Sequence, residues 1–216
     1  MSTNAYPFTP SVELFDRPFP ASHRLILASA SPRRRELLGK MGLSFTVLPA
    51  DADETIPSAL SPRDAVGLLS VRKAYAALPL LEKSAQKPVI LAADTIVDFG
   101  GRALGKPTDA RDAFDTLMSM SGSLHEVHTG CSLLCGTRLY TEVITSTVHM
   151  RPYTEEEVRA YVDSCECMGK AGSYAIQGLG GQLISHYEGA LDNIVGLPTR
   201  CVADLLLRAL ESEEML

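Results

Sequence analysis

The chain has 216 residues, of which 45% are hydrophobic and 21% are charged, an ordinary composition for one folded domain. Its 26 acidic and 20 basic residues give a formal charge of -6, which argues against a broad nucleic-acid-binding surface but is compatible with a small anionic ligand held by a few local cations. The five cysteines form no CxxC pair, no apolar run approaches the roughly 20 residues of a membrane span, and the N-terminus lacks a basic start followed by an apolar stretch. We therefore expect a cytoplasmic protein with reduced thiols and with neither a membrane nor a nucleic-acid partner.

Apolar runs predict the strands, and apolar residues three or four positions apart behind capping residues predict the helices. Four prolines in the first 22 residues predict an N-terminal extension (1–22) before a single domain (23–216). In chain order the expected elements are a strand at 24–28, a helix at 33–41, a strand at 45–48, a helix at 61–78, a strand at 89–93, a helix at 108–120, strands at 126–134 and 139–150, and helices at 154–164 and 199–211. Because the two long strands at 126–150 form a hairpin, the alternating strands and helices predict an α/β fold with a mixed sheet.

The segment SASPRRR joins the first expected strand to the first expected helix. Ser31 suits the N-cap and Pro32 the first helical position. A helix N-terminus favours phosphate, and the hydroxyl of Ser29 with the guanidinium groups of Arg33 and Arg34 would add charge-assisted hydrogen bonds. Since three cations in the first turn oppose the helix dipole, the alternative is an ordinary N-cap followed by a solvated basic turn.

Asp94 and Thr95 follow the continuous apolar run at 89–93, which is typical of a strand covered on both faces. We expect Asp94 to end this strand. A carboxylate at the end of a buried parallel strand lies where α/β proteins place their ligands, and it can bind a metal ion or take a proton from water. The alternative is an aspartate that only forms the turn.

Two other motifs match known patterns only in part. The segment from Gly100 to Lys106 nearly fits the phosphate-binding pattern GxxxxGK[ST], but Pro107 replaces the magnesium-binding hydroxyl, so Lys106 is expected to serve as a lone phosphate cation. His125 and His128 lack the spacing of a helical zinc motif and would point to opposite faces of a strand. We expect one of them to be structural and the other exposed.

The glycine-rich segment GKAGSYAIQG at 169–178 combines a flexible backbone with a cation and an amide. The side chain of Gln177 offers both a donor and an acceptor, so it can read the edge of a base.

Taken together, these segments resemble the Maf family of nucleotide pyrophosphatases. The similar stretches are LILASASPRRRELL, SVRKA, VILAADTIV, LGKP, SG followed by HEVHTG, and GKAGSYAIQG, in the family's order over about Arg24 to Arg208. The resemblance implies a mixed α/β fold like that of inosine-triphosphate pyrophosphatases, with two lobes around a central cleft, and often a homodimer. It also implies hydrolysis of a nucleoside triphosphate to a monophosphate and pyrophosphate.

The resemblance also assigns roles to residues. Asp94 falls on the proposed proton acceptor and Glu54 near an acidic position, so both are candidate ligands of a divalent cation, Mg²⁺ or Mn²⁺. The phosphate-handling positions are Ser29, Arg33, Arg34, Lys73 and Lys106. Members that act on dTTP and UTP are similar to this chain at Arg33, Thr95 and Gln177. Relatives carry more acidic residues where this chain has CECM at 165–168, which leaves Glu166 only as a substitute ligand.

The leading hypothesis is a nucleoside triphosphate pyrophosphatase acting on dTTP, UTP or modified pyrimidine triphosphates in the upkeep of nucleotide pools. One alternative is a non-catalytic nucleotide-binding regulator of cell division, which would bind triphosphate without releasing pyrophosphate. Another is a P-loop phosphotransferase built on Gly100 to Lys106, which would release the γ-phosphate.

Overall fold

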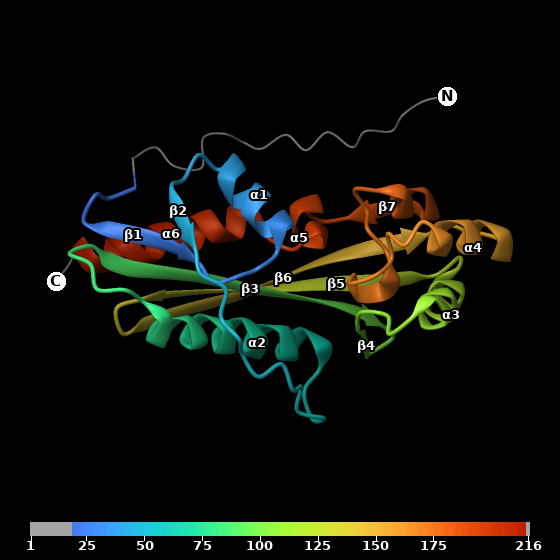
Figure 1. Cartoon of the computed structure of the whole chain (residues 1–216), viewed down its shortest axis with the longest axis horizontal. Coiled ribbons are helices and arrows are strands. Elements are labelled where there is room, and N and C mark those ends of the chain that lie inside the picture. Colours follow the sequence, from blue (N-terminus) through green and yellow to red (C-terminus); the bar gives the residue numbers. More distant parts are fainter. Residues whose placement is uncertain (1–18, 215–216) are drawn as a thin grey trace.

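A seven-stranded mixed sheet runs through the centre of the molecule (Figure 1). The structure, a computed structural model, describes residues 19–214, so most of the predicted N-terminal extension lies outside the described residues. In chain order the strands and helices are β1 (His23–Leu27), α1 (Pro32–Lys40), β2 (Phe45–Val47), α2 (Pro62–Ala77), β3 (Lys87–Phe99), β4 (Arg102–Leu104), α3 (Ala110–Met120), β5 (Leu124–Cys135), β6 (Arg138–Met150), α4 (Glu155–Asp163), β7 (Ile184–Glu188), α5 (Leu191–Val195) and α6 (Thr199–Glu214). Three short 3₁₀ helices are η1 (Leu78–Leu80), η2 (Ala171–Ser173) and η3 (Leu179–Leu183).

The strand order is β2-β1-β3-β5-β6-β7, with β4 paired to the end of β3. Strands β2, β1 and β3 are parallel, whereas β3, β5, β6 and β7 form an antiparallel series. The prediction of a mixed α/β fold is confirmed, and the long hairpin of β5 and β6 is the element that makes the sheet mixed.

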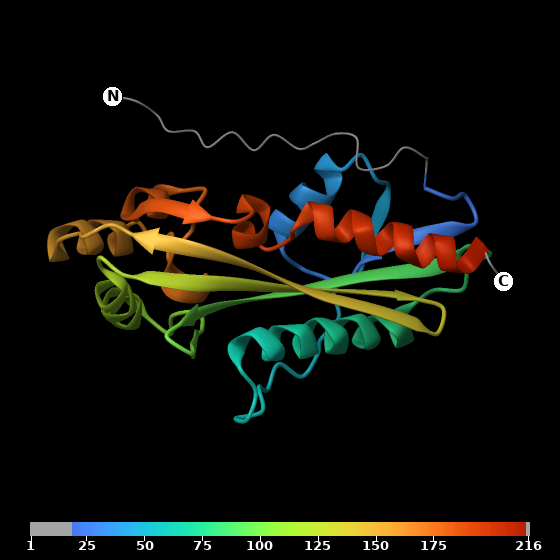
Figure 2. The same ribbon diagram turned by 180° about the vertical axis from the view of Figure 1, so that it is seen from behind.

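Helices cover both faces of the long strands. Helix α2 lies on one face and α6 on the other, as the two opposite views show (Figures 1 and 2). On β3, Val89 and Leu91 belong to the large core on the α6 face, while Ile90 and Ala92 pack with Ala74 of α2. Each fully buried aliphatic side chain of this kind contributes about 1.5–3 kcal/mol. The apolar run at 89–93 is therefore continuous because both of its faces are covered.

The predicted helix starts are confirmed by their caps. Ser31 and Ser61 accept hydrogen bonds from the third helical N–H groups of α1 and α2, and Asp109 does so for α3. Thr154 and Glu157 form a reciprocal capping box at the start of α4. Since these contacts lie within four residues of the chain, they could be read from the sequence.

The expectation that Asp94 ends a strand is wrong. Strand β3 continues to Phe99, because β5 pairs with it from Val89 to Asp98. On its other edge, β3 is paired with β1 up to Leu91 and with β4 only from Val97. Within the described residues, Asp94 thus lies in an unbroken strand beside a gap in the sheet edge between β1 and β4.

The two histidines of the segment at 125–128 point to opposite faces of β5, as predicted, but both are buried, each 1% exposed. The expectation of one exposed histidine is wrong. His125 Nε2 lies 2.8 Å from the hydroxyl of Tyr174, which covers it. His128 Nδ1 lies 2.8 Å from Thr145 Oγ1 on the neighbouring strand.

The smaller elements lie at the two ends of the long strands, with β1, β2 and α1 towards one end and β4, α3 and α4 towards the other (Figure 1). These groups correspond to the two lobes that the family resemblance implies. No helix in the described range 19–214 is long and apolar enough to cross a membrane.

Candidate active site

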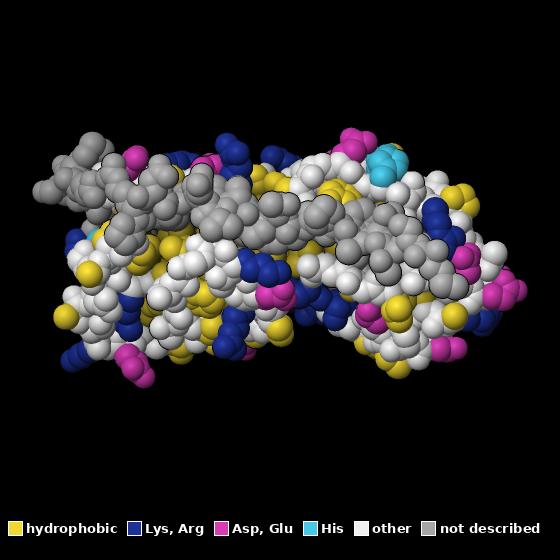
Figure 3. Space-filling model, turned by 90° about the horizontal axis from the view of Figure 1, so that it is seen from above, with side chains coloured by type: hydrophobic (Ala, Val, Ile, Leu, Met, Phe, Trp, Pro, Cys, Tyr) yellow, Lys and Arg dark blue, Asp and Glu magenta, His cyan; other side chains and the backbone are white. Residues whose placement is uncertain are grey.

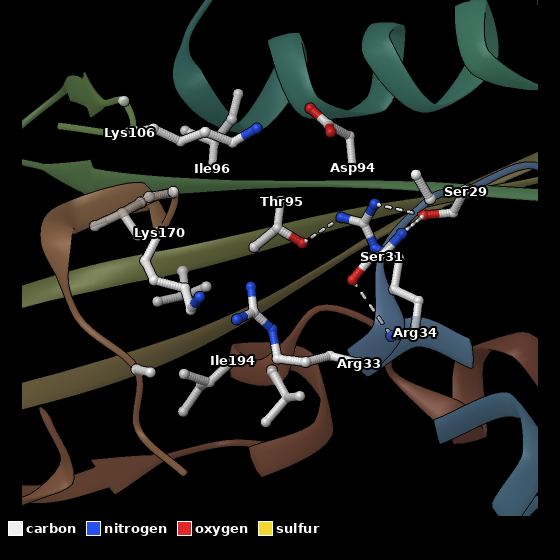
Figure 4. A pocket seen from close by; sticks show the side chains of 18 of the residues that line it. Ser29, Ser31, Arg33, Arg34, Asp94, Thr95, Ile96, Lys106, Lys170 and Ile194 are labelled. Atoms are coloured by element: carbon white, nitrogen blue, oxygen red, sulfur yellow. Dashed lines mark hydrogen bonds between the residues drawn. The ribbon is translucent and has the colours of Figure 1, made fainter. Parts of the chain in front are cut away.

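A cleft of about 770 Å³ opens at the gap in the edge of β3, a size typical of small-molecule sites. Because it opens at a sheet edge, side chains from both faces of β3 reach it (Figure 4). The residues assigned to the site from the sequence all line this cleft: Ser29, Arg33, Arg34, Glu54, Lys73, Asp94, Thr95, Lys106 and Gln177. Sequence segments up to 148 positions apart are thereby brought together.

One side of the cleft carries an ion-paired group that we call the carboxylate wall, formed by Glu54, Lys73 and Asp94. Lys73 comes from α2, and its Nζ lies 2.5 Å from Asp94 Oδ1 and 2.7 Å from Glu54 Oε1. The Lys73 and Asp94 side chains are 15% and 14% exposed, whereas that of Glu54 is 62% exposed. The hydrogen bond from Lys73 lowers the pKa of Glu54 below its usual value.

The carboxylate wall has the donor chemistry of a hard divalent cation. Asp94 and Glu54 already converge on one positive charge, the Lys73 ammonium. Carboxylate oxygens are also the ligands that Mg²⁺ and Mn²⁺ prefer. The residues present therefore fit such a cation, provided that the Lys73 ammonium shifts to admit it.

The opposite side is a hydrogen-bonding network in which one guanidinium donates to uncharged oxygen atoms. We call it the arginine wall, formed by Ser29, Arg34 and Thr95. Arg34 Nη2 donates to Thr95 Oγ1 at 3.0 Å and Nη1 donates to Ser29 Oγ at 3.3 Å. Arg34 Nε donates to the carbonyl of Gly196 at 2.8 Å. Gly196 has a φ of 119°, and a Cβ at this position would approach Thr95 Oγ1 to 3.2 Å, so the close approach requires glycine.

The arginine wall is held from behind by β5 and α5. Thr95 Oγ1 lies 2.9 Å from Thr129 Oγ1, and Thr129 donates to the carbonyl of Asn193 at 2.9 Å. Burial lowers the pKa of Arg34, and the charge of Asp94 counteracts this shift. Three of the five guanidinium N–H groups are used inside the protein, which leaves two for a ligand.

Three further cations face the cleft without protein partners. Among the described residues, the side chains of Arg33, Lys106 and Lys170 make no hydrogen bond or ion pair, and all three line the cleft (Figure 4). Glu54, which is already paired with Lys73, offsets only part of this positive charge, so an anion bound between the three cations would relieve their mutual repulsion. The cleft is therefore built to receive a polyanion beside Asp94.

Lys170 is a cleft residue that sequence reasoning did not assign, although it is the cation of the glycine-rich segment. Gly172, with a φ of 67°, turns the chain so that η2 packs closely on Val97 of β3. This packing brings Lys170 and Gln177 to the cleft. A lysine between glycines beside the other phosphate-handling motifs is the signal that could have identified it.

Glu166 has a different role from that of a substitute metal ligand. Its carboxylate accepts hydrogen bonds from the backbone N–H groups of Leu179 at 3.1 Å and Gly180 at 2.9 Å. A Cβ at Gly178 would collide with the same carboxylate, so a larger residue there would displace Glu166 from these two N–H groups. Glu166 does not line the cleft; it holds the turn from behind.

The P-loop alternative is not supported by the backbone. Gly100 and Gly101 form the hairpin turn between β3 and β4, and Lys106 follows β4. A P-loop instead connects a strand directly to a helix whose N-terminus holds the phosphates.

Comparison with known proteins agrees with this geometry. Residues 24–209 match the model of a family described as Maf-like protein. The dTTP/UTP pyrophosphatase of Desulfitobacterium hafniense (strain Y51) is 44% identical over 185 residues, covering 84% of this chain and 83% of the relative. That of Bdellovibrio bacteriovorus (strain ATCC 15356 / DSM 50701 / NCIMB 9529 / HD100) is 43% identical, covering 84% and 96%. That of Bordetella avium (strain 197N) is 45% identical, covering 86% and 95%.

Proposed function

Because this chain belongs to the Maf-like protein family, we propose that its cleft hydrolyses dTTP and UTP, and modified pyrimidine triphosphates, to the monophosphate and pyrophosphate. This activity would serve the upkeep of nucleotide pools. The observation that carries the proposal is the convergence of three unpaired cations on a cleft that also holds the carboxylate of Asp94.

In this mechanism the triphosphate lies between the two walls. Arg33, Lys106 and Lys170 neutralise the phosphate oxygens, and the N-terminus of α1 and the free N–H groups of Arg34 add donors. Positive charge fixed in place before the reaction stabilises the departing pyrophosphate, and such preorganised charge is usually the largest catalytic contribution.

Asp94 orients a water molecule and accepts its proton as the water oxygen attacks the α-phosphorus. The bond between the α-phosphorus and the bridging oxygen breaks, and pyrophosphate leaves. Before a cation binds, Lys73 holds the Asp94 carboxylate in the cleft through their ion pair. Strand β3 holds the same residue from the backbone, so Asp94 has little freedom to move.

Asp94 and Glu54 are the residues that would hold Mg²⁺ or Mn²⁺. The chemistry of such a cation is to neutralise charge on phosphate oxygens. Gln177 is exposed at the rim of the cleft, where its amide can pair with the polar edge of a pyrimidine.

The test is the purified full chain against a panel of common and modified triphosphates with Mg²⁺ or Mn²⁺, scoring pyrophosphate separately from phosphate. In ¹⁸O-labelled water, attack on the α-phosphorus puts the label in the monophosphate. Label in pyrophosphate, or release of γ-phosphate, would contradict the mechanism. Tight binding of dTTP without turnover would instead favour the non-catalytic regulator.

Two further properties remain part of the proposal. The family resemblance implies a homodimer, which light scattering of the purified chain tests. The cysteines support a reducing compartment, the cytoplasm, because Cys131, Cys167 and Cys201 are buried as thiols. Microscopy of a tagged chain tests this location.

A further inference from the structure

A second cluster of metal-ligating side chains lies away from the cleft, on the antiparallel pair β6–β7. His149 of β6 stands directly opposite His186 of β7, and Glu188 follows on the same face two residues later. Figure 3 shows histidine and acidic side chains together on an open part of the surface. We call His149, His186 and Glu188 the histidine cluster. None of its members lines the cleft.

The side chains of the histidine cluster already converge. The two imidazole rings are stacked with centroids 4.0 Å apart and an interplanar angle of 13°. His149 Nε2 lies 3.2 Å from Glu188 Oε1, and one ligand atom from each of the three residues lies within 4.8 Å of the others. Ligand atoms around one tetrahedral zinc ion are about 3.3 Å apart, so small rotations of surface side chains suffice to close the site.

A neighbouring hydroxyl also prepares one ligand. Ser185 Oγ lies 2.9 Å from His186 Nδ1, which leaves Nε2 of the same ring for a metal. Metal-binding histidines usually have their second nitrogen held in this way, since the contact fixes the tautomer and the ring orientation. The His149 and Glu188 side chains are 25% and 69% exposed, so ions in solution can reach them.

We propose that the histidine cluster binds a divalent transition metal, with Zn²⁺ as its preferred type, and that water completes the coordination. Two imidazoles and one carboxylate suit Zn²⁺, Ni²⁺ or Cu²⁺ and disfavour Mg²⁺. The all-oxygen donor set of Asp94 and Glu54 has the opposite preference. The chain thus has two sites that different cations occupy.

The position of the cluster indicates what bound metal does. Among the described strands, β7 pairs only with β6, and their register shifts between His149 and Met150. Strand β7 follows directly on η3, the end of the segment that carries Gln177. A metal bound by His149 and His186 ties the two strands together across this irregular pair, and so stabilises β7.

A second candidate group, Asp98, Glu126 and His128, lacks these properties. His128 Nδ1 already contacts Thr145, its Nε2 faces Asp98 at 3.4 Å, and its side chain is only 2% exposed. These contacts satisfy the imidazole inside the protein, so this group provides the control for the experiment.

The experiment is a calorimetric titration of the full chain with Zn²⁺ in excess Mg²⁺, which occupies hard oxygen sites. We expect one Zn²⁺ per chain and a loss of affinity of at least about tenfold in both His149→Ala and His186→Ala. The control Glu126→Gln should bind as the unchanged chain does. Unchanged affinity in the histidine variants, or a loss in Glu126→Gln, would overturn the proposal.

Hydrogen exchange gives a second measurement. Zn²⁺ should slow amide exchange in β7 of the unchanged chain and leave it unaltered in His186→Ala. Hydrolysis of dTTP in Mg²⁺ should be the same in both chains, which shows that the variant is folded. Slowing of exchange by Zn²⁺ in the variant as well would contradict the assignment.

Discussion

The two walls of the cleft face the same ligand but are built differently. The carboxylate wall consists of charges that neutralise one another, and its Glu54 side chain is largely open to solvent. The arginine wall is a network of hydrogen bonds that connects α1, β3 and the turn before α6. In the carboxylate wall, a metal cation can replace the Lys73 ammonium as the partner of the two carboxylates, which frees Lys73 to contact phosphate. In the arginine wall, any rearrangement would break hydrogen bonds that join separate parts of the fold. Function and stability are thus divided between the two sides of one strand.

The largest expected effect comes from breaking the carboxylate wall. Asp94→Asn should lower kcat by about 10²–10⁴-fold, because an amide cannot accept the proton, while the chain still folds because Lys73 keeps Glu54 as an ionised partner. The steady-state rate of pyrophosphate release measures this loss of kcat. Asp98→Asn is the matched control, since Asp98 lies on the same face of β3 outside the cleft. Equal losses in both variants would mean that the strand, rather than the carboxylate, is what matters.

Removal of the guanidinium from the arginine wall should mainly cost stability. Arg34→Met leaves Ser29, Thr95 and the Gly196 carbonyl without their donor, and we expect a loss of roughly 3–5 kcal/mol in denaturant unfolding. Arg33→Met, one residue earlier, should leave the unfolding free energy nearly unchanged and raise KM. If both variants lose stability equally, the division between the walls is wrong.

Acid should destabilise the fold through His125, whose imidazole contacts the hydroxyl of Tyr174 at the cleft. Burial lowers the pKa of His125 from 6.5 to about 4, with a smaller contribution from His149. The unfolded chain therefore takes up this proton first, and about 3 kcal/mol of stability, fully present above pH 6.5, is lost as the pH falls to 4. In urea unfolding between pH 6.5 and 4, the unfolding free energy of His125→Phe should fall less steeply with decreasing pH than that of the unchanged chain. An identical slope would assign the acid sensitivity elsewhere.

The smallest effect is expected at the turn behind Gln177. Glu166→Gln keeps one acceptor oxygen for two backbone N–H groups, so the turn loosens and KM for dTTP should rise by about threefold to tenfold, corresponding to roughly 1 kcal/mol. The exposed Glu155→Gln on α4 is the control. A fall in kcat with unchanged KM would place Glu166 in the chemical step instead.

Local signals in the sequence were sufficient for the helix starts and for the cleft residues Arg33, Asp94 and Lys106. Ser31, Pro62 and the pair Thr154–Glu157 act within one turn of their own helix, so their roles do not depend on the rest of the fold. The family resemblance added Lys73 and Glu54, which no local pattern would have selected.

Features that depend on distant segments could not be predicted. The apolar run ends at Ala93, yet β3 continues because β5 supplies a partner as far as Asp98. His149 and His186 face each other only through the register of β6 and β7. The contact of Arg34 with Gly196 joins residues 162 positions apart, so the sequence could suggest a phosphate ligand but not a structural clamp.

The continuity of β3 limits how the enzyme can change shape. The pairing of β3 with β5 continues before and after Asp94 along the strand, so we expect the backbone of Asp94 to stay in place when nucleotide enters. The segments at 48–61 and 169–183, which carry Glu54 and Gln177, lie outside the long strands, and we expect opening and closing to occur there. Structures determined with and without bound nucleotide should superimpose along β3 and differ in the backbone of those two segments. Substitutions at the rim of the cleft, around Gln177, can then change which base is selected while the position of Asp94 stays the same.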